Sequence, residues 1–120
     1  MNYVKLPKEN LAAFIESLRA FGKLYGPVRI DEAHYFQEIG MSKEMDLHYP
    51  RTMMPPKKLF LKLKEKMLTY DEISGQYKET IQEEKIIVFG MNACDIYALK
   101  LMDKIQLGEP PDKYYRSSRE

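Results

Sequence analysis

The sequence has very little cysteine: Cys94 is the only one in 120 residues. One cysteine cannot form a disulfide within the chain, and this is typical of proteins from a reducing compartment. It also cannot supply alone the several thiolates that hold a zinc ion or an iron-sulfur cluster. We therefore expect a cytoplasmic protein, with no metal site in this chain alone.

Long apolar runs and an excess of charge of one sign are missing as well. The longest apolar run, IIVFGM, is far shorter than the roughly 20 residues that cross a bilayer. The N-terminal residues lack the apolar region of a signal peptide. Nineteen basic and eighteen acidic residues give a net charge of +1, so no overall field attracts nucleic acid or an anionic membrane. The sequence predicts neither of these partners.

What the chain does contain is typical of a folded protein, with 44% hydrophobic and 31% charged residues. Its length is close to that of one ordinary domain, and no interior stretch has the composition of a linker. We therefore expect a single domain over residues 1–120.

Apolar residues at helical spacing predict two main helices. Residues 7–22 form the first, and its expected apolar stripe consists of Leu11, Phe14, Ile15, Leu18 and Phe21. Residues 93–105 form the second, with an expected buried face of Cys94, Ala98, Leu101 and Ile105, widened by Ile96 and Leu99. Gly108 and the prolines after it end this helix.

Five segments are rich in residues that favour strands, namely 3–6, 25–30, 34–39, 59–63 and 86–89. Residues 25–30 and 34–39 predict a hairpin around Asp31 and Glu32, in which Pro27 suits only the beginning or the edge of a strand. Residues 86–89 are typical of a strand buried on both faces. A helix is an alternative for residues 59–63, and residues 74–84 are expected to be a polar helix or a connection. The expected fold is α+β, with a mixed sheet of about five strands and two main flanking helices.

The candidate chemistry centres on Cys94, which follows the last predicted strand and opens a helix. If Asn92 is the N-cap, free backbone N–H groups of the first turn favour a thiolate at Cys94. Asp95 is expected to reach back to the cap, and its negative charge opposes that thiolate. A working thiol and a packed core residue therefore both remain open, and the local pattern favours the packed residue.

The evidence for a functional site is weaker at the other candidate residues. Lys57 and Lys58 open a lysine-rich segment that suits an anion or an acidic protein face, although a solvated surface is the simpler interpretation. His34 and His48 lack metal-ligand spacing and are expected to have surface or packing roles beside tyrosines. A thiol triad of Cys94, His48 and Asp46 is disfavoured because nothing in the sequence brings the three residues together.

Several segments resemble, in this order, the N-terminal part of the beta subunit of cytosolic nickel-iron hydrogenases, the sulfhydrogenases of hyperthermophilic archaea, and the related anaerobic sulfite reductase A subunit. The segments are YVKLPKEN, KLYGPVRI, RTMMPPKKLFLK, VFGMNACDIYALKLMD and PDKYYRSSRE. The resemblance implies a subunit that carries 4Fe-4S clusters and passes electrons between a flavin- and nicotinamide-binding subunit and the hydrogenase subunits. It also implies further cysteine motifs beyond the matched region, with which Cys94 would complete a cluster. The sequence departs from the family at Leu63 and Lys64, where a proline is usual.

Two functions follow as expectations. The first is a docking or scaffold domain, or a truncated copy, of an electron-transfer subunit, with hydrogenase and flavoprotein subunits as partners and no activity or cofactor of its own. The second is a standalone binding module that holds an anionic ligand or a protein through the strand–turn–helix at Gly90 to Cys94 and the lysine-rich segment. The candidate interaction residues are Lys57, Lys58, Asn92 and Asp95. A ligand that raises the melting temperature of the isolated chain would indicate the second function.

Overall fold

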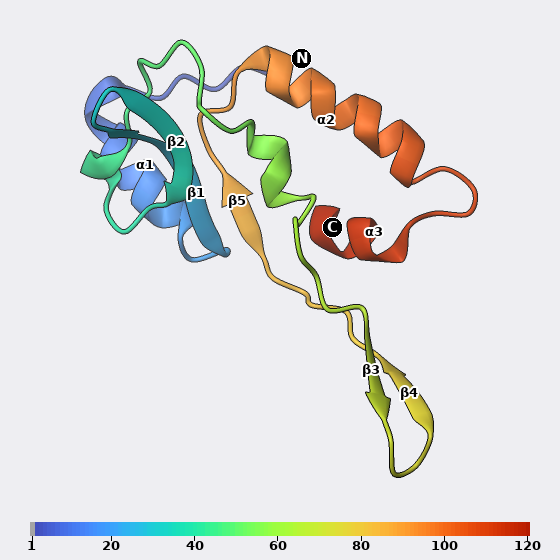
Figure 1. Cartoon of the computed structure of the whole chain (residues 1–120). Coiled ribbons are helices and arrows are strands. Elements are labelled where there is room, and N and C mark those ends of the chain that lie inside the picture. The colour runs from blue at the N-terminus through green and yellow to red at the C-terminus, as the bar shows by residue number, and fades with distance from the viewer. Residues whose placement is uncertain (1) are drawn as a thin grey trace. The chain divides into compact units, whose positions relative to one another are not determined.

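A computed structural model describes residues 2–120, and its contacts divide the chain into two compact units (Figure 1). Unit 1 contains the residues up to Met54 together with Lys85–Met91, and unit 2 contains Pro55–Glu84 together with Asn92–Glu120. Each unit is therefore built from two separate stretches of sequence. The expectation of one domain over residues 1–120 is not tested by this division and stays a prediction.

Unit 1 is a three-stranded mixed sheet with one α-helix. Its elements are the short 3-10 helix η1 (Lys8–Asn10), α1 (Leu11–Leu18), β1 (Lys23–Ile30), β2 (Ala33–Glu38), η2 (Ser42–Glu44) and β5 (Ile86–Val88). The strand order is β2-β1-β5, with β1 antiparallel to β2 and parallel to β5. The predicted hairpin is confirmed, and Asp31 at its turn has a φ of 54°, which Asp tolerates better than most residues.

Pro27 lies in the middle of the central strand without breaking the ladder. β5 pairs with β1 only from Lys23 to Tyr25, so beyond Tyr25 that side of β1 has no strand beside it. Backbone groups alternate sides along a strand. The Tyr25 carbonyl accepts from Phe89 on the β5 side, and the Pro27 carbonyl, two residues on, accepts from the Asp46 amide at 2.8 Å. The missing N–H of Pro27 therefore points to the side of β1 that β5 does not reach. The prediction that Pro27 lies at the beginning or the edge of its strand was wrong, because a central strand with one side locally unpaired also accommodates a proline.

The core of unit 1 is small and apolar. Ile15 of α1, Leu24 of β1 and Ile39 after β2 are buried together, and Leu11, Leu18, Val28, Met45, Ile87 and Phe89 pack around them. α1 ends at Leu18, earlier than predicted, so Phe21 of the expected stripe lies outside the helix and is exposed. A Cβ at Gly22 would lie 2.5 Å from the Lys85 carbonyl oxygen, so glycine is required where the chain turns into β1.

Unit 2 combines helices with a second, separate sheet. Its elements are the 3-10 helix η3 (Pro56–Leu59), β3 (Leu68–Asp71), β4 (Gln76–Glu79), α2 (Ala93–Gln106) and α3 (Lys113–Arg119). β3 and β4 form a two-stranded antiparallel hairpin in which Leu68 pairs with Glu79 and Asp71 with Gln76. The α+β class is confirmed, and the five strands among residues 2–120 fall into two sheets.

Several local predictions were wrong. Residues 3–6 are exposed and form no strand. Residues 59–63 form no strand either: Leu59 ends the 3-10 helix that begins at Pro56, and residues 60–63 follow it without regular structure. The segment predicted as a polar helix or connection contains β4 instead, because Asp71 closes a tight turn: its Oδ1 accepts from the Ile73 amide and its Oδ2 from the Ser74 hydroxyl. β5 is only half-buried, because it lies at the edge of its sheet rather than between two strands.

The polar C-terminal segment folds into α3, which the sequence analysis did not predict. Asp112 is its N-cap, and its Oδ1 accepts from the Tyr114 and Tyr115 amides at 2.9 Å each. These two bonds satisfy amides that the first turn of a helix otherwise leaves unpaired. Tyr115 gives the short helix its buried anchor.

Candidate functional site

All five candidate residues lie in unit 2. Asn92, Cys94 and Asp95 stand at the start of α2, and Lys57 and Lys58 lie in η3, which packs against α2. The structure thus places the predicted thiol region and the predicted basic region on two neighbouring helices. Lys57 and Lys58 are half-buried rather than fully solvated.

The start of α2 follows the predicted strand–turn–helix pattern. The chain turns at Gly90, two residues after the end of β5, where φ is 79°. Asn92 has extended backbone at the N-cap, and its carbonyl accepts from the Asp95 and Ile96 amides at 3.0 and 3.1 Å. This confirms Asn92 as the N-cap, although its side chain makes no capping bond. The thiolate expected at Cys94 stays a prediction.

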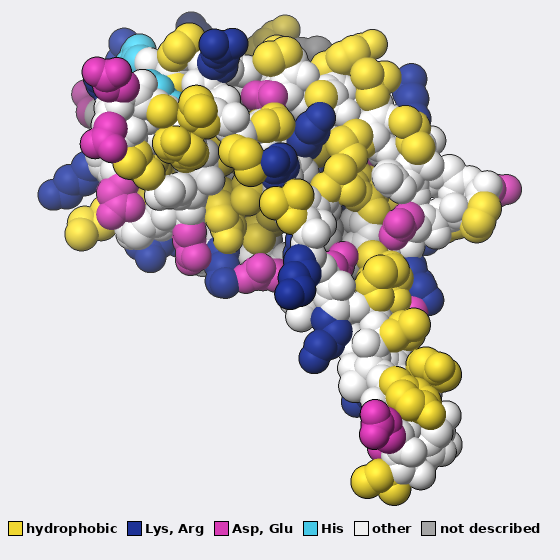
Figure 2. Space-filling view, in the orientation of Figure 1, with side chains coloured by type: hydrophobic (Ala, Val, Ile, Leu, Met, Phe, Trp, Pro, Cys, Tyr) yellow, Lys and Arg dark blue, Asp and Glu magenta, His cyan; other side chains and the backbone are white. Residues whose placement is uncertain are grey.

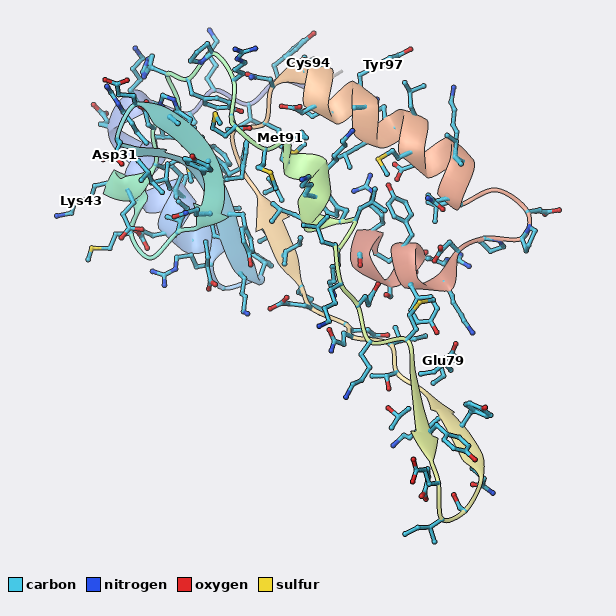
Figure 3. All side chains as sticks on the ribbon, viewed as in Figure 1. Asp31, Lys43, Glu79, Met91, Cys94 and Tyr97 are labelled. Carbon is cyan, nitrogen blue, oxygen red and sulfur yellow. The ribbon has the colours of Figure 1, made fainter. Side chains whose placement is uncertain are left out.

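The packed interpretation of Cys94 is wrong, because its side chain is exposed. α2 faces the rest of unit 2 with Leu99, which is 5% exposed, and with half-buried side chains at helical spacing on either side of it, Asp95, Ala98, Met102, Asp103 and Gln106. The predicted face of Cys94, Leu101 and Ile105 points outward. Figure 3 shows Cys94 and Tyr97 on the side of α2 that faces away from α3.

A charged cluster explains this rotation of α2. Asp103 receives two hydrogen bonds from Arg119 of α3, Nε to Oδ1 at 2.8 Å and Nη2 to Oδ2 at 2.7 Å. The Tyr115 hydroxyl donates to Asp103 Oδ1 at 2.8 Å. The Arg119 guanidinium also lies 5.0 Å from the centre of the Phe60 ring. Asp103 must face α3 to make these contacts, and this turns the Leu101 side of the helix outward. We call Asp103, Tyr115 and Arg119 the polar lock.

The polar lock shifts the pKa of each of its members. Hydrogen bonding from Arg119, and then from Tyr115, holds the pKa of the Asp103 carboxyl below its ordinary value, against a smaller opposing effect of burial. Burial, and then the bond to Asp103, raises the pKa of Tyr115 to about 12. The bond to Asp103 likewise raises the pKa of Arg119. These directions describe a cluster that keeps its charges fixed near neutral pH, which suits a structural role.

A second polar cluster ties the hairpin to α3. Lys113 forms an ion pair with Glu79 of β4, and the Tyr114 hydroxyl donates to Glu79 Oε1 at 2.9 Å and lies 3.2 Å from the Met67 carbonyl. Lys113, followed by Tyr114, lowers the pKa of the Glu79 carboxyl. Nearby, Glu65 Oε1 is buried and makes no hydrogen bond within the described residues, and Lys62 Nζ lies 3.6 Å from it.

The histidines lie in unit 1, apart from the candidate residues. His34 Nε2 lies 3.0 Å from Asp46 Oδ2, and the His34 ring packs 6.0 Å from the ring of Tyr49. This confirms a packing role for His34. His34, followed by the His48 amide, lowers the pKa of the Asp46 carboxyl. Asp46 and His48 thus belong to a unit that does not contain Cys94, and the disfavoured triad has no support.

The donor set does not fit a 4Fe-4S cluster within this chain. Such a cluster takes four protein ligands, normally cysteines, and the sequence has one. Across residues 2–120, no group of three or more His, Cys, Asp or Glu side chains is arranged to hold a metal ion. In the same residues, no helix combines the length and the apolar composition needed to cross a membrane.

Two features were not predicted from the sequence, namely the outward face of α2 and the aromatic pair of the hairpin. Tyr70 and Tyr77 face each other across β3 and β4 with ring centres 4.8 Å apart, and both are exposed. The signal for this hairpin was the pair of aromatic strands LTYD and QYKE around a turn that ends in glycine. No comparable signal in the sequence shows which side of α2 lies inward.

The comparisons with known proteins support the predicted resemblance. The chain is 37% identical over 119 residues to the protein named "Sulfhydrogenase 2 subunit beta" from Pyrococcus furiosus. The match covers 99% of this chain and 35% of the length of that subunit. No family model matches the chain, and the comparison with solved structures gave no match. The chain is thus similar over nearly its whole length to about one third of a sulfhydrogenase beta subunit.

Proposed function

We propose that this chain is a docking or scaffold domain of the electron-transfer subunit of a hydrogenase complex. The observation that carries this proposal is the 37% identity over 99% of the chain to a sulfhydrogenase beta subunit. A similarity that continues from the core of unit 1 through α3 supports a common fold for the whole segment. The partners we propose are hydrogenase subunits and a flavoprotein subunit, and the cytoplasmic location stays a prediction.

The role proposed for this segment is to assemble the complex rather than to carry electrons itself. One cysteine is too few for a 4Fe-4S cluster, so clusters of the full-length subunit would take their ligands mainly from other segments. Both units instead offer folded surfaces. In unit 1 the sheet rests on an apolar core, and in unit 2 the polar lock fixes α2 against α3.

Co-expression tests this proposal. The chain would be produced with the hydrogenase and flavoprotein subunits of its organism, purified through a tag on the hydrogenase, and weighed by native mass spectrometry. We expect this chain in a fixed stoichiometry with the other subunits, and no binding to an unrelated flavoprotein. Recovery of the tagged subunits as a complete assembly without this chain would overturn the proposal.

The alternative of a standalone anion-binding module makes a different prediction. Inorganic phosphate would then raise the melting temperature of the isolated chain, and the double variant Lys57→Ala, Lys58→Ala would lose that rise. A chain that joins the complex and shows no phosphate-dependent rise would fit the docking domain alone.

A further inference from the structure

The outer face of α2 carries an apolar stripe made of Cys94, Tyr97, Leu101 and Ile105. Tyr97 is 64% exposed and Ile105 is 77% exposed, and Leu101 and Cys94 are exposed as well. These positions follow one another at spacings of three, four and four residues, which places them on one side of a helix. A helix that binds into an apolar groove, or receives a partner helix, presents anchors at this spacing.

The orientation of this stripe is fixed within unit 2. Leu99 is buried on the opposite side of α2, and Asp103 is held by two hydrogen bonds from Arg119. Rotating α2 to bury the stripe would expose Leu99 and break the polar lock. Burial of an apolar side chain is favourable, so the packing already present opposes this rotation.

The charges along α2 are divided between its two sides. Lys100 and Lys104 are exposed and border the apolar stripe. The two acidic residues of the helix, Asp95 and Asp103, are half-buried on the other side, and Asp103 is neutralised by Arg119. Figure 2 shows hydrophobic side chains with Lys and Arg side chains beside them over this part of the molecule. The exposed side of α2 is therefore apolar with a positive border.

The lysines that border the stripe oppose the binding of a second copy of this chain. In an antiparallel pair of α2 helices about a twofold axis, identical flanks meet. Lys100 and Lys104 would then face the same lysines of the other copy, and like charges across an interface oppose association. A partner with acidic residues beside its own apolar anchors would instead be attracted by Lys100 and Lys104.

We infer that the outer face of α2 is the surface through which this chain binds a partner subunit, and that the partner presents an apolar helix bordered by Asp and Glu. This inference rests on the proposed docking function and names the contact that would perform it. The apolar stripe provides the buried centre of the contact, and the two lysines provide orientation and selectivity.

The test uses the complex of this chain with the hydrogenase and flavoprotein subunits. The double variant Leu101→Glu, Ile105→Glu is expected to bind at least about tenfold more weakly, as is usual when central anchors of an interface are lost. Lys100→Glu with Lys104→Glu is expected to lower affinity about threefold or more and to reduce its salt dependence. The matched controls are Ile73→Glu, at a hairpin side chain that is 99% exposed, and Lys43→Glu in unit 1; both are expected to bind normally.

Two further measurements identify the partner segment that binds the outer face of α2. Cys94 is the only cysteine, so its rate of reaction with N-ethylmaleimide reports on this face, and it should fall in the complex. A photo-crosslinking residue in place of Tyr97 should join the chain to a partner segment rich in Asp and Glu. Circular dichroism of each variant shows that it remains folded.

The outcomes separate the two proposals. If the wild-type chain forms no complex, the docking function and the α2 surface both fail. If the complex forms and the Leu101 and Ile105 variant binds as tightly as the controls, only the α2 surface fails. A crosslink to a second copy of this chain, or to a segment without acidic residues, would overturn the partner chemistry.

Discussion

The two units hold their elements together by different means. In unit 1, the side chains of Ile15, Leu24 and Ile39 exclude water between a helix and a sheet. In unit 2, the contact between α2 and α3 depends on a charged residue, Asp103, held by Arg119 and Tyr115. Apolar burial is largely insensitive to pH and salt, whereas an ion pair depends on both. The units should therefore respond differently to the same change of solution.

The two sheets show the same contrast. The sheet of unit 1 has a buried face, whereas all eight strand residues of the β3–β4 hairpin are exposed. A two-stranded hairpin without a covered face is only marginally stable in water. Its order depends on the Asp71 turn, the tyrosine pair and the Glu79 contacts at its base. The hairpin is thus the part of unit 2 that we expect to open first.

The largest expected effect is on the apolar core. Leu24 is 2% exposed at the centre of unit 1, and Leu24→Ala should lower the free energy of unfolding by about 2–5 kcal/mol. Urea unfolding followed by circular dichroism measures this change. Leu63→Ala, at an exposed leucine of unit 2, is the matched control and should change stability by less than about 0.5 kcal/mol. Equal effects of the two variants would contradict the core assigned to unit 1.

Breaking the polar lock should have the next largest effect. Asp103→Asn leaves Arg119 partly buried without its carboxylate and should lower the free energy of unfolding by about 1–3 kcal/mol. Because the pKa of Asp103 is lowered, its contribution is present above the ordinary value of 3.8 and is lost as pH falls through the lowered pKa. The variant should therefore lose less stability than the wild type on acidification.

The control for that experiment is Glu120→Gln, which removes an exposed ion pair with Arg116 on the same helix. Surface pairs of this kind contribute little, so no change should be resolved. A double-mutant cycle of Asp103→Asn with Tyr115→Phe measures the coupling within the lock. Additive effects of these two changes would show that the lock does not act as one cluster.

Alkaline pH should weaken unit 2 before unit 1. Tyr115 is 3% exposed, and burial raises its pKa from 10.0 to about 12. Because the folded state disfavours the ionised form of Tyr115, the contribution of Tyr115 to stability is complete below pH 10. This contribution is lost as the pH rises through about 12. NMR signals of the Leu99 methyl groups in unit 2 should therefore change before those of Leu24 in unit 1.

Tyr115→Phe should make this alkaline transition less steep, and the ultraviolet titration of the tyrosines should lose its latest step. Tyr25→Phe, in unit 1, provides the comparison for the removal of one tyrosine. A late step that survives in Tyr115→Phe would assign the raised pKa to a different tyrosine.

The smallest expected effect concerns the hairpin. Tyr77→Ala removes the aromatic pair with Tyr70 and should cost about 0.5–1.5 kcal/mol of local stability. Amide hydrogen exchange should become faster in β3 and β4 and stay unchanged in β1 and β2. Thr69→Ala, on the facing strand β3 at the position that pairs with Lys78, is the matched control. Faster exchange throughout the chain would mean that the hairpin is more tightly coupled to the core than its exposure indicates.

The sequence predicted the elements whose signals are local. The stripe of α1, the β1–β2 hairpin, β5 and α2 were recognised from periodicity and punctuation. α3 was missed because its stability comes from the Asp112 cap and a single buried tyrosine, and not from an apolar stripe. Residues 59–63 were misjudged because alternation of Leu and Lys suits a strand, while two preceding prolines start a 3-10 helix.

The candidate site shows a different limit of sequence analysis. The N-cap at Asn92 was predictable, because caps are read from neighbouring residues. The exposure of Cys94 was not predictable, because apolar residues occur on both sides of α2. A contact between residues that are 16 positions apart in the sequence selects the inner side. The Asp103–Arg119 pair, which makes that selection, joins residues on two helices. Hydrophobic periodicity does not weigh an ion pair of this kind against leucine and isoleucine.

The strand order β2-β1-β5 has a consequence for how the protein is made. β2 follows β1 after a short turn, whereas β5 reaches β1 only after about 60 further residues, including all of Pro55–Glu84. During synthesis, one edge of β1 therefore remains unpaired while the η3 and hairpin segments are added. An open edge beside apolar side chains is a site of aggregation for a nascent chain. The strand order therefore leaves the β5 edge of β1 unpaired in the nascent chain for longer than the β2 edge.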